Sequence, residues 1–586
     1  MRKLHVRSVI KKKWRKSYYM NNEQRTCQNC KKDFTIESED LAFYEKINVP
    51  PPTWCPKCRL IRRFSFMNLW SLYKRKCSKC GKSMVSIHPE NTEFPVYCQP
   101  CWWADDWDGT EYAIEYDSNR PFLQQVQELA KKTPYMGLES AYLTNTNCDY
   151  TNGTAYSKNC YMTFWADYCE NVYYSIFLFN LRDSLNCYRM KDSELCYEDV
   201  GCYKCYGTYY SEECDSCTDI WFSRSCIGCS HCFGCINLRN KSYCIFNEQY
   251  SKEKYFEKLK EFNLSSYFAL ENIKRKVYEL WLQHPRRAYI GNSLNVNVTG
   301  DYVYESKNSR DAYMVSGVED SRFTQFISVA KAHDSYDYTG WGNGAERIYE
   351  SCVVGEGANN IKFSNECWPD VLNVEYSIYG ITCKNIIGCV NLKRKEYCIL
   401  NKQYTKEEYE KLSAHIRKDM EQNPYSDVVG RVWKYGEFLP YELSPFSYNQ
   451  TIALAFFPKE KEEVLGEGIK WRETEENEYP ITMRAQDIPD SIENTDESIL
   501  KEVIACENCG KAYKILQGEL DILKRFSLPL YHHCSICRRN ILFSKTNLPY
   551  LYDRSCMKCG KAIKTSYAPE RPEIVYCEEC YQAEIA

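Results

Sequence analysis

The chain has 586 residues, a formal net charge of −3 and 44% hydrophobic residues, so it is not disordered throughout. It contains no apolar run of about 18 residues that would indicate a membrane span, and its first 20 residues lack the apolar stretch of a secretory signal. Its 35 cysteines suit either an oxidised secreted scaffold or a reduced metalloprotein. The missing signal and the paired cysteines favour a cytoplasmic protein.

The N-terminal region is strongly basic. Residues 1–80 carry 20 Lys/Arg against 6 Asp/Glu, and residues 1–26 form a basic arm. Aromatic residues alternate with the basic ones, and cations neutralise phosphates while aromatic rings stack on bases. We therefore predict nucleic-acid binding, to RNA more than to DNA, because single strands expose their bases. The predicted contacts are Lys11, Lys12, Lys13, Arg15, Lys16, Arg59, Arg62, Arg63, Lys74 and Arg75. The alternative is a solvated tail followed by a partly buried linker.

Eight Cys-x-x-Cys pairs form two sets of four, one near each end of the chain. The spacers between the pairs are identical in the two sets, so every ligand position recurs at an offset of 479. Two such pairs complete a tetrahedral four-thiolate site, so we predict four structural Zn2+ sites. The spacing alone leaves two pairings open, a sequential one and a cross-braced one of the RING type. The predicted ligands are Cys27, Cys30, Cys55, Cys58, Cys77, Cys80, Cys98, Cys101, Cys506, Cys509, Cys534, Cys537, Cys556, Cys559, Cys577 and Cys580.

The stretch CQNCKKDFTIESEDLAFYEKINVPPPTWCPKCR, residues 27–59, resembles the probable zinc-ribbon family, and CENCGKAYKILQGELDILKRFSLPLYHHCSICR matches it in the C-terminal copy. The second half of each copy resembles a companion ribbon, which implies sequential pairing. The N-terminal double ribbon spans 27–104 and the C-terminal one 504–586. Over nearly its full length, including YGEFLPYELSPFSYNQTIALAFFP, the chain is similar to cysteine-rich proteins of candidate-phylum bacteria that often carry a CaiB/BaiF CoA-transferase label. The residues give that label no support, because neither a βαβ alternation nor an acidic nucleophile in a recognisable setting is present.

The interior contains two similar lobes. GCINLRNKSYCIFN, from Gly234, is repeated as GCVNLKRKEYCILN, from Gly388, at an offset of 154. Asn147, Asn159 and Asn171 recur at every twelfth position within short β-type segments separated by turn residues. This period predicts two tandem β-solenoid lobes, 146–250 and 297–404, in a mainly β protein; a pair of β-sandwiches is the alternative.

The remaining segments are predicted to be connectors. Residues 105–145 form a linker with a helix, and 251–296 a helical connector whose helix begins at Ser251. Thr405 and Glu408 form a capping box that starts a second helix. The region 405–503 is expected to continue as an acidic linker, since residues 459–503 carry 14 Asp/Glu against 6 Lys/Arg.

Cys226, Cys229, Cys232 and Cys235 form a C-x2-C-x2-C-x2-C run. It could hold an extra zinc ion or an iron–sulfur cluster, but lobe 2 retains only Cys383 and Cys389 of the corresponding run. The favoured interpretation is a ladder of small buried thiols that fill the solenoid core.

No enzyme is expected. The sequence lacks the common hydrolase, metalloprotease and phosphate-binding motifs, and closed four-cysteine sites leave no open position for substrate. The leading hypothesis is a zinc-binding, non-catalytic protein that binds RNA or DNA. The alternative is a protein-interaction scaffold whose ribbons serve as structural caps. We expect no membrane partner and identify no small-molecule substrate.

Overall fold

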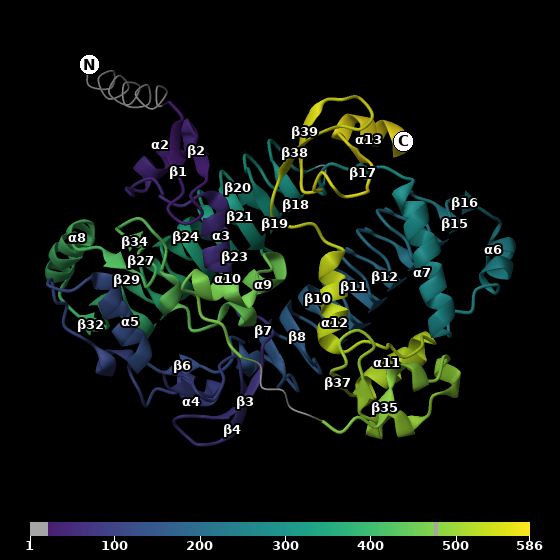
Figure 1. Ribbon diagram of the computed structural model, residues 1–586, viewed down its shortest axis with the longest axis horizontal. Coiled ribbons are helices and arrows are strands. Elements are labelled where there is room, and N and C mark those ends of the chain that lie inside the picture. Colours follow the sequence, from purple (N-terminus) through teal and green to yellow (C-terminus); the bar gives the residue numbers. More distant parts are fainter. Residues whose placement is uncertain (1–20, 293, 474–478, 586) are drawn as a thin grey trace, which may run out of the picture.

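Two parallel β-sheets form two solenoid lobes, around which the helices and ribbons are arranged (Figure 1). The structure, a computed structural model, describes residues 21–292, 294–473 and 479–585. In lobe 1, Thr218 of β13 (Thr218–Trp221) pairs in parallel with Ser230 of β14 (Ser230–Phe233), one coil further on. Parallel pairing between strands that lie one coil, or twelve residues, apart in the sequence is characteristic of a β-solenoid. The β-sandwich alternative is therefore wrong.

The lobes differ in coil length. In lobe 1 each coil advances the chain by twelve positions, as from Ile176 to Tyr188, whereas the coils of lobe 2 around Tyr336, Tyr349 and Lys362 are one position longer. The other strands of lobe 1 are β7 (Thr151–Ala155), β8 (Thr163–Asp167), β9 (Glu170–Tyr173), β10 (Ile176–Leu185), β11 (Tyr188–Tyr197), β12 (Tyr206–Tyr209), β15 (Ser242–Ile245) and β16 (Glu248–Gln249). The strands of lobe 2 are β18 (Gly300–Tyr304), β19 (Ala312–Ser316), β20 (Val318–Glu319), β21 (Arg322–Ile327), β22 (Ala332–His333), β23 (Tyr336–Gly342), β24 (Ala345–Gly355), β25 (Asn359–Lys362), β26 (Asn365–Cys367), β27 (Leu372–Glu375), β28 (Ile378–Ile381), β29 (Lys384–Ile387), β30 (Val390–Lys393), β31 (Glu396–Ile399) and β32 (Lys402–Gln403).

A shorter period, of three positions, underlies the coil. Every third residue from Gly153 to Phe246 has a positive φ, so each coil of lobe 1 turns at four corners. Asn and Asp adopt this left-handed conformation most readily, and side-chain bonds link Asn159 to Asn171 and Asn171 to Asp183 on successive coils. Bulky residues also occupy corners, held there by hydrogen bonds to the coils on either side.

The residue after most corners of lobe 1 points into the core, and many of these residues are small. Its backbone N–H is often satisfied by a side chain of the preceding coil: Cys187 N donates to Ser175 Oγ at 2.9 Å. The Ser175 hydroxyl in turn donates to the carbonyl of Tyr173. Cys229 N bonds Cys217 Sγ in the same way at 3.4 Å. Serine and cysteine therefore fill the core because each combines small volume with an acceptor atom.

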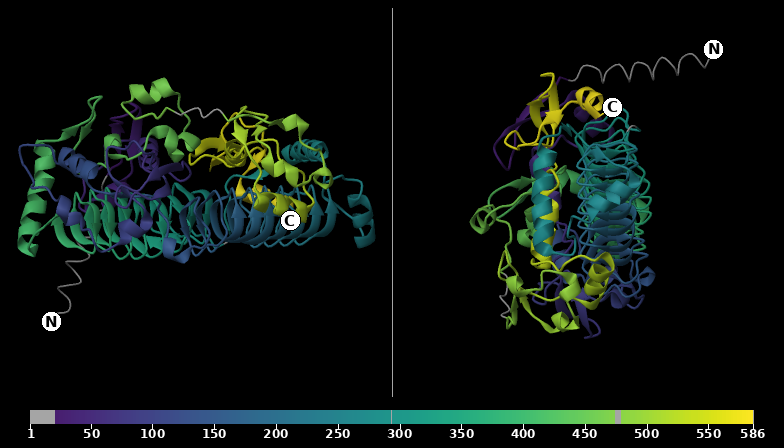
Figure 2. Two further views of the ribbon diagram at one scale, coloured as in Figure 1. Left: turned by 90° about the horizontal axis from the view of Figure 1, so that it is seen from below. Right: turned by 90° about the vertical axis from the view of Figure 1, so that its right-hand side faces the viewer.

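The two lobes lie side by side at their first coils and extend in opposite directions, which gives the long row of strands in Figure 2. As the chain advances through lobe 1, its contacts recede along lobe 2. The contacting pairs are Trp165 with Gly340, Phe177 with Phe326, and Tyr203 with Tyr304.

Each terminal module consists of hairpins and short helices around its cysteines. In the N-terminal module these are β1 (Glu23–Thr26), β2 (Asp33–Ile36), α2 (Ser38–Lys46), α3 (Pro56–Phe64), β3 (Tyr73–Lys76), β4 (Ser83–Ser86), β5 (Val96–Tyr97) and α4 (Gln99–Trp103). In the C-terminal module they are β36 (Ile504–Ala505), β37 (Ala512–Tyr513), α11 (Gln517–Phe526), α12 (Ser535–Ser544), β38 (Tyr552–Ser555), β39 (Ala562–Thr565), β40 (Val575–Tyr576) and α13 (Glu578–Ile585).

The predicted connectors contain helices whose caps match the sequence. Ser251 accepts from Lys254 N, and Thr405 and Glu408 form the expected capping box. The first connector holds two helices rather than one, α6 (Lys252–Leu259) and α7 (Tyr267–Leu282). The other helices outside the modules are α5 (Phe122–Lys132), α8 (Lys406–Gln422), α9 (Ile452–Phe456) and α10 (Lys461–Gly466), and the remaining strands are β6 (Tyr135–Met136), β17 (Arg286–Arg287), β33 (Tyr425–Ser426), β34 (Val432–Trp433) and β35 (Met483–Arg484).

The segment after α8 is more than a linker. Trp433, Phe438, Tyr441 and Tyr448 are buried in the core between the N-terminal module and lobe 2. Their aromatic side chains explain why this stretch packs, whereas the acidic residues that suggested a linker come later.

Candidate metal centres and the ribbon–solenoid interface

The sixteen predicted ligands come together in four groups of four. Within each group the sulfur atoms lie within 4.8 Å of one another, and each group joins consecutive Cys-x-x-Cys pairs. Sequential pairing is therefore confirmed, and the cross-braced alternative is wrong.

The sulfur positions fit a tetrahedral metal ion. Cys30 Sγ lies 3.8 Å from Cys55 Sγ, and Cys80 Sγ lies 3.8 Å from Cys98 Sγ. A tetrahedron with metal–sulfur bonds of about 2.3 Å has edges of about 3.8 Å, as in a four-thiolate zinc site. The donor set and its geometry thus match a structural metal centre closed by four thiolates.

Hydrogen bonds to the sulfurs favour their ionised form. Burial disfavours the Cys77 thiolate, but backbone N–H groups of Cys80 and Cys98 donate toward it and lower its pKa to about 7. Two side-chain amides at equivalent positions also donate to ligand sulfurs: Asn29 Nδ2 donates to Cys58 Sγ and Asn508 Nδ2 to Cys537 Sγ, each at 3.4 Å. Such outer-shell donors orient the ligands of a metal site.

The three arginines of α3, termed the arginine cluster, are buried: Arg59, Arg62 and Arg63. Arg59 lies 2.8 Å from Asp337 Oδ2 and 3.1 Å from Glu350 Oε1.

The other two members have carboxylate partners as well. Arg62 pairs with Glu350 at 2.9 Å and with Glu437 at 3.2 Å, and Arg63 pairs with Asp337 at 3.1 Å. The prediction that Arg59, Arg62 and Arg63 contact nucleic acid is therefore wrong, because their charges are sequestered against lobe 2 and the Glu437 segment.

The other predicted nucleic-acid contacts receive little support. Arg75 is also buried and donates to Pro89 O and Thr92 Oγ1, so it too is a structural residue rather than a phosphate contact. Lys74 is exposed. Lys11, Lys12, Lys13, Arg15 and Lys16 lie outside the described residues.

The C-terminal module meets lobe 1 through the equivalent helix, α12. Arg538, which corresponds to Arg59 at the offset of 479, donates to Asn186 Oδ1 at 2.9 Å and lies over the Tyr531 ring at 3.5 Å from its centroid. Each module also reaches the other lobe. Asn152 of lobe 1 donates to Asn68 O of the N-terminal module, and Ser566 of the C-terminal module donates to Asp301 of lobe 2.

The thiols of the C-x2-C-x2-C-x2-C run do not form a site with three or more ligands. Each belongs to a different corner of one coil, and among the described residues they are absent from the groups whose ligand atoms lie within 4.8 Å. Each donates instead to the carbonyl two residues earlier, as Cys226 does to Arg224 O at 3.5 Å. Core serines such as Ser175 also donate to the carbonyl two residues earlier. This shared bond supports the interpretation that Cys226, Cys229, Cys232 and Cys235 fill the solenoid core.

A fifth ligand group, His333, Asp334 and Glu346, lies on lobe 2. Lys46 Nζ lies 2.7 Å from Asp334 Oδ2, so the lysine ammonium already neutralises one carboxylate of this group.

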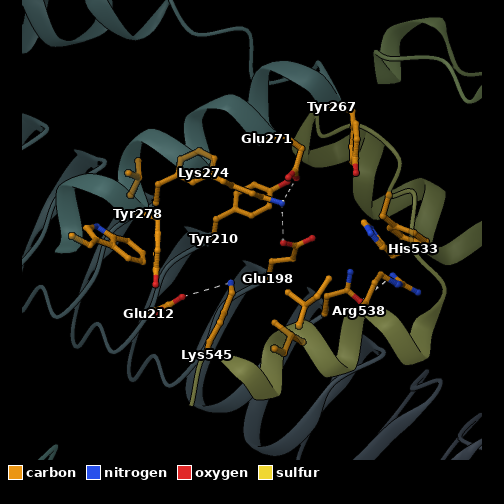
Figure 3. Close-up of a pocket in the computed structure, with 17 residues that line it drawn as sticks. Glu198, Tyr210, Glu212, Tyr267, Glu271, Lys274, Tyr278, His533, Arg538 and Lys545 are labelled. Carbon is orange, nitrogen blue, oxygen red and sulfur yellow. Dashed lines mark hydrogen bonds and ion pairs between the residues drawn. The ribbon is translucent and has the colours of Figure 1, made fainter. Parts of the chain in front are cut away.

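A pocket of about 270 Å³ lies between α7, lobe 1 and α12 (Figure 3). Lys274 bridges Glu198 at 3.3 Å and Glu271 at 2.9 Å. Burial disfavours the Lys274 ammonium, yet the two carboxylates raise its pKa. Lys545 lies 3.7 Å from Glu212 on the opposite wall. The sequence analysis missed this pocket, because alignment of the modules equates Arg538 with Arg59 but does not show that either arginine faces a solenoid lobe.

Comparison with protein-family models, with curated proteins and with solved structures finds no match for this chain. Within the part of the chain that the structure describes, no helix has the length and apolar character needed to span a membrane.

Proposed function

We propose that the protein is a zinc-binding, non-catalytic protein-interaction scaffold in which two double zinc ribbons clamp two solenoid lobes together. The observation that carries the proposal is that each module contacts both lobes. The N-terminal module reaches lobe 1 through Asn68 and lobe 2 through Arg63, and the C-terminal module reaches lobe 1 through Arg538 and lobe 2 through Ser566.

Zinc suits this role. Four thiolates at tetrahedral distances favour Zn2+, and a structural zinc site in a small peptide contributes about 10–16 kcal/mol to folding. Cys55 and Cys58 flank the first residues of α3, and Cys534 and Cys537 hold α12 in the same way. Metal binding would therefore position the helices that carry the interface arginines.

A scaffold is favoured over a nucleic-acid-binding protein because four of the predicted basic contacts have structural roles. The nucleic-acid hypothesis now depends on Lys74 and on residues that precede the described region. Fluorescence anisotropy with mixed-sequence RNA and DNA across a salt series separates the two. A scaffold should show no binding even at about 50 mM salt, where phosphate attraction is strong. Tight binding whose logarithm falls steeply with the logarithm of salt concentration would support the nucleic-acid hypothesis instead.

The clamp is tested by metal removal. We expect four Zn2+ per chain by elemental analysis and, after chelation, faster hydrogen exchange in α3, α12 and the strands that they cover. The last coils of each lobe, such as those around Cys244 and Cys398, should stay protected because their cores contain no metal ligand. Unchanged exchange in α3 and α12 after complete metal loss would contradict the clamp.

A further inference from the structure

One column of core residues in lobe 1 begins with a thiol at the surface. Cys148 lies in the first coil and is only partly buried, whereas the other cysteines in the described part of the two lobes are buried. Thr146 of this coil pairs with Lys158 alone, whereas Lys158 pairs with Thr146 on one side and with Glu170 on the other. The residues on either side of Cys148 in the sequence are exposed. The Cys148 thiol is therefore open to small solutes, unlike the thiols deeper in the core.

Cys160 occupies the same position one coil further on. Asn147 Nδ2 donates to Asn159 Oδ1 at 3.1 Å, so the residues that follow these two corners, Cys148 and Cys160, are in register. Adjacent strands lie about 4.8 Å apart, within the range of about 4.4–6.8 Å that separates the Cα atoms of a disulfide. The two cysteines thus have the backbone spacing that a disulfide requires.

The first coils of lobe 2 show that packing does not require cysteine at these two positions. The hydrogen bond from Asn297 Nδ2 to Asn308 Oδ1, at 3.1 Å, marks the equivalent corners of lobe 2. The residues that follow these corners are Val298, which packs against the core, and Ser309, which is buried. Valine and serine therefore fill the same positions, and the thiol pair is an additional feature of lobe 1.

The contacts of Cys148 favour its reactive, ionised form. The Cys148 thiolate accepts from the thiol and from the backbone N–H of Cys160, and its pKa is lowered to about 7 against the opposing effects of burial and of Asp149. By contrast, burial raises the pKa of Cys169, on the second coil, to about 12. Cysteines that sense oxidants combine thiolate character, access to solvent and a neighbouring resolving thiol. Cys148 has all three properties, with Cys160 as the resolving thiol.

We propose that Cys148 and Cys160 are an oxidation site for hydrogen peroxide, which converts them to a disulfide between the first two coils of lobe 1. The Cys148 thiolate attacks one peroxide oxygen, the O–O bond breaks, and the departing hydroxide takes up a proton to become water. The sulfur of Cys160 then attacks the sulfur of the resulting sulfenic acid. An S–S bond forms, the S–O bond breaks, and the hydroxyl leaves as water with the Cys160 proton. The two thiols lose two electrons in total, one peroxide is reduced to two water molecules, and the site is independent of the proposed scaffold function.

The disulfide would tighten the coil that meets the N-terminal module. It closes a loop between Cys148 and Cys160, and within this loop Asn152 Nδ2 donates to Asn68 O of that module. A disulfide stabilises a fold by restricting the open chain, so hydrogen exchange at the amides of residues 149–159 should slow at least about tenfold in the linked protein. Unchanged exchange in these residues would contradict the stabilising effect of the link.

The test treats full-length, zinc-loaded protein with hydrogen peroxide and maps the cysteines by alkylation, proteolysis and mass spectrometry. Cys232 and Cys244 are the matched control pair, because they also lie one coil apart in lobe 1 but are buried. We expect the Cys148–Cys160 link to form at least about tenfold faster than a Cys232–Cys244 link. Equal rates for the two pairs, or a Cys148–Cys160 link found only in protein that has lost zinc, would overturn the proposal.

Two variants that introduce the residues of lobe 2 separate the roles of the two thiols. Cys160→Ser removes the resolving thiol, so oxidation should stop at the sulfenic acid of Cys148, which dimedone labels. Cys148→Val should abolish both the dimedone label and the link. A Cys160→Ser protein whose Cys148 takes up no dimedone after peroxide treatment would contradict the assignment of Cys148 as the first thiol oxidised.

Alkylation of the unaltered protein provides an independent check if a variant fails to fold. At neutral pH, iodoacetamide should label Cys148 at least about tenfold faster than Cys244, because only Cys148 is both accessible and substantially ionised. Equal labelling of the two thiols would overturn the proposal. Zinc content is measured on the same samples, so that failure of this site is distinguished from failure of the zinc clamp.

Discussion

The arginine cluster and its carboxylates should make Glu350 one of the most sensitive positions in the chain. Three cations, Arg59, Arg62 and Arg63, face three anions, Asp337, Glu350 and Glu437, and all six side chains are at most 5% exposed. Glu350→Gln keeps the shape but leaves the cluster with one unbalanced positive charge. Removing one partner of a buried ion pair costs about 3–5 kcal/mol, so local opening at this interface should become roughly a hundredfold to several thousandfold more frequent.

Hydrogen exchange is the appropriate assay, because a multi-domain protein need not unfold in two states. We expect the amides of α3 and of β23–β24 to exchange faster in Glu350→Gln by that factor. Glu257→Gln, which breaks the exposed pair with Lys254 on α6, serves as the control and should change nothing at α3.

A double substitution tests the charge argument itself. Arg62→Met combined with Glu350→Gln restores two cations against two anions, and Thr53 still donates to Glu437. The double variant should be less destabilised than the sum of the single variants by about 1–3 kcal/mol. Exchange at α3 that accelerates less than about tenfold in Glu350→Gln, or strictly additive effects, would refute the reasoning.

Three further predictions concern the metal sites and the solenoid core. Cys30→Ser should lower the zinc content by one ion per chain and speed exchange in α3 but not in α12; loss of more than one ion would contradict independent sites. Ser223→Ala removes the acceptor of Cys235 N and should lower the stability of lobe 1 by about 1–3 kcal/mol. Ser223→Cys should lower it less, because sulfur still accepts the hydrogen bond. Local hydrogen exchange in lobe 1 compares the two variants. Burial raises the pKa of Asp199 from 3.8 to about 7, so its ionisation opposes folding as pH rises from about 4 through 7, by at most roughly 4 kcal/mol. Asp199→Asn should therefore flatten the loss of lobe 1 stability between about pH 4 and 7 in exchange measurements, and an unchanged slope would show that Asp199 is not responsible.

The metal sites were accessible to sequence reasoning because their chemistry is local. Two cysteines separated by two residues present both thiols to one ion whatever surrounds them, and equal spacers in both modules indicate equal folds. The twelve-residue coil of lobe 1 was equally predictable from the even spacing of Asn147, Asn159 and Asn171, because the left-handed corner positions favour asparagine.

The shorter period of three positions was not visible, because the left-handed corners accept many residue types. Tyr174, Phe177, Arg189 and Leu195 all occupy such corners, and no propensity predicts them there. Their conformation is imposed by the ladder of hydrogen bonds to neighbouring coils, which only the assembled solenoid supplies.

The arginine cluster illustrates a second limit. Basic residues next to aromatic ones are typical of a nucleic-acid surface, but the same composition suits a buried interface when carboxylates are present. For Arg63 the nearest carboxylate, Asp337, is 274 positions away in the sequence. Composition and spacing contain no information about a partner at that separation, so the three-dimensional structure was needed to assign these charges.

The divergence of the two interfaces links the fold to the proposed function. If both modules served only to cap the solenoid, the same packing would suffice twice. One interface instead carries three arginines and an internal aromatic segment, and the other carries Arg538 and the helix α7. The two clamps therefore differ in the chain segment that completes them, residues 433–438 at the N-terminal interface and α7 at the C-terminal one, although both act on equivalent positions of the lobes.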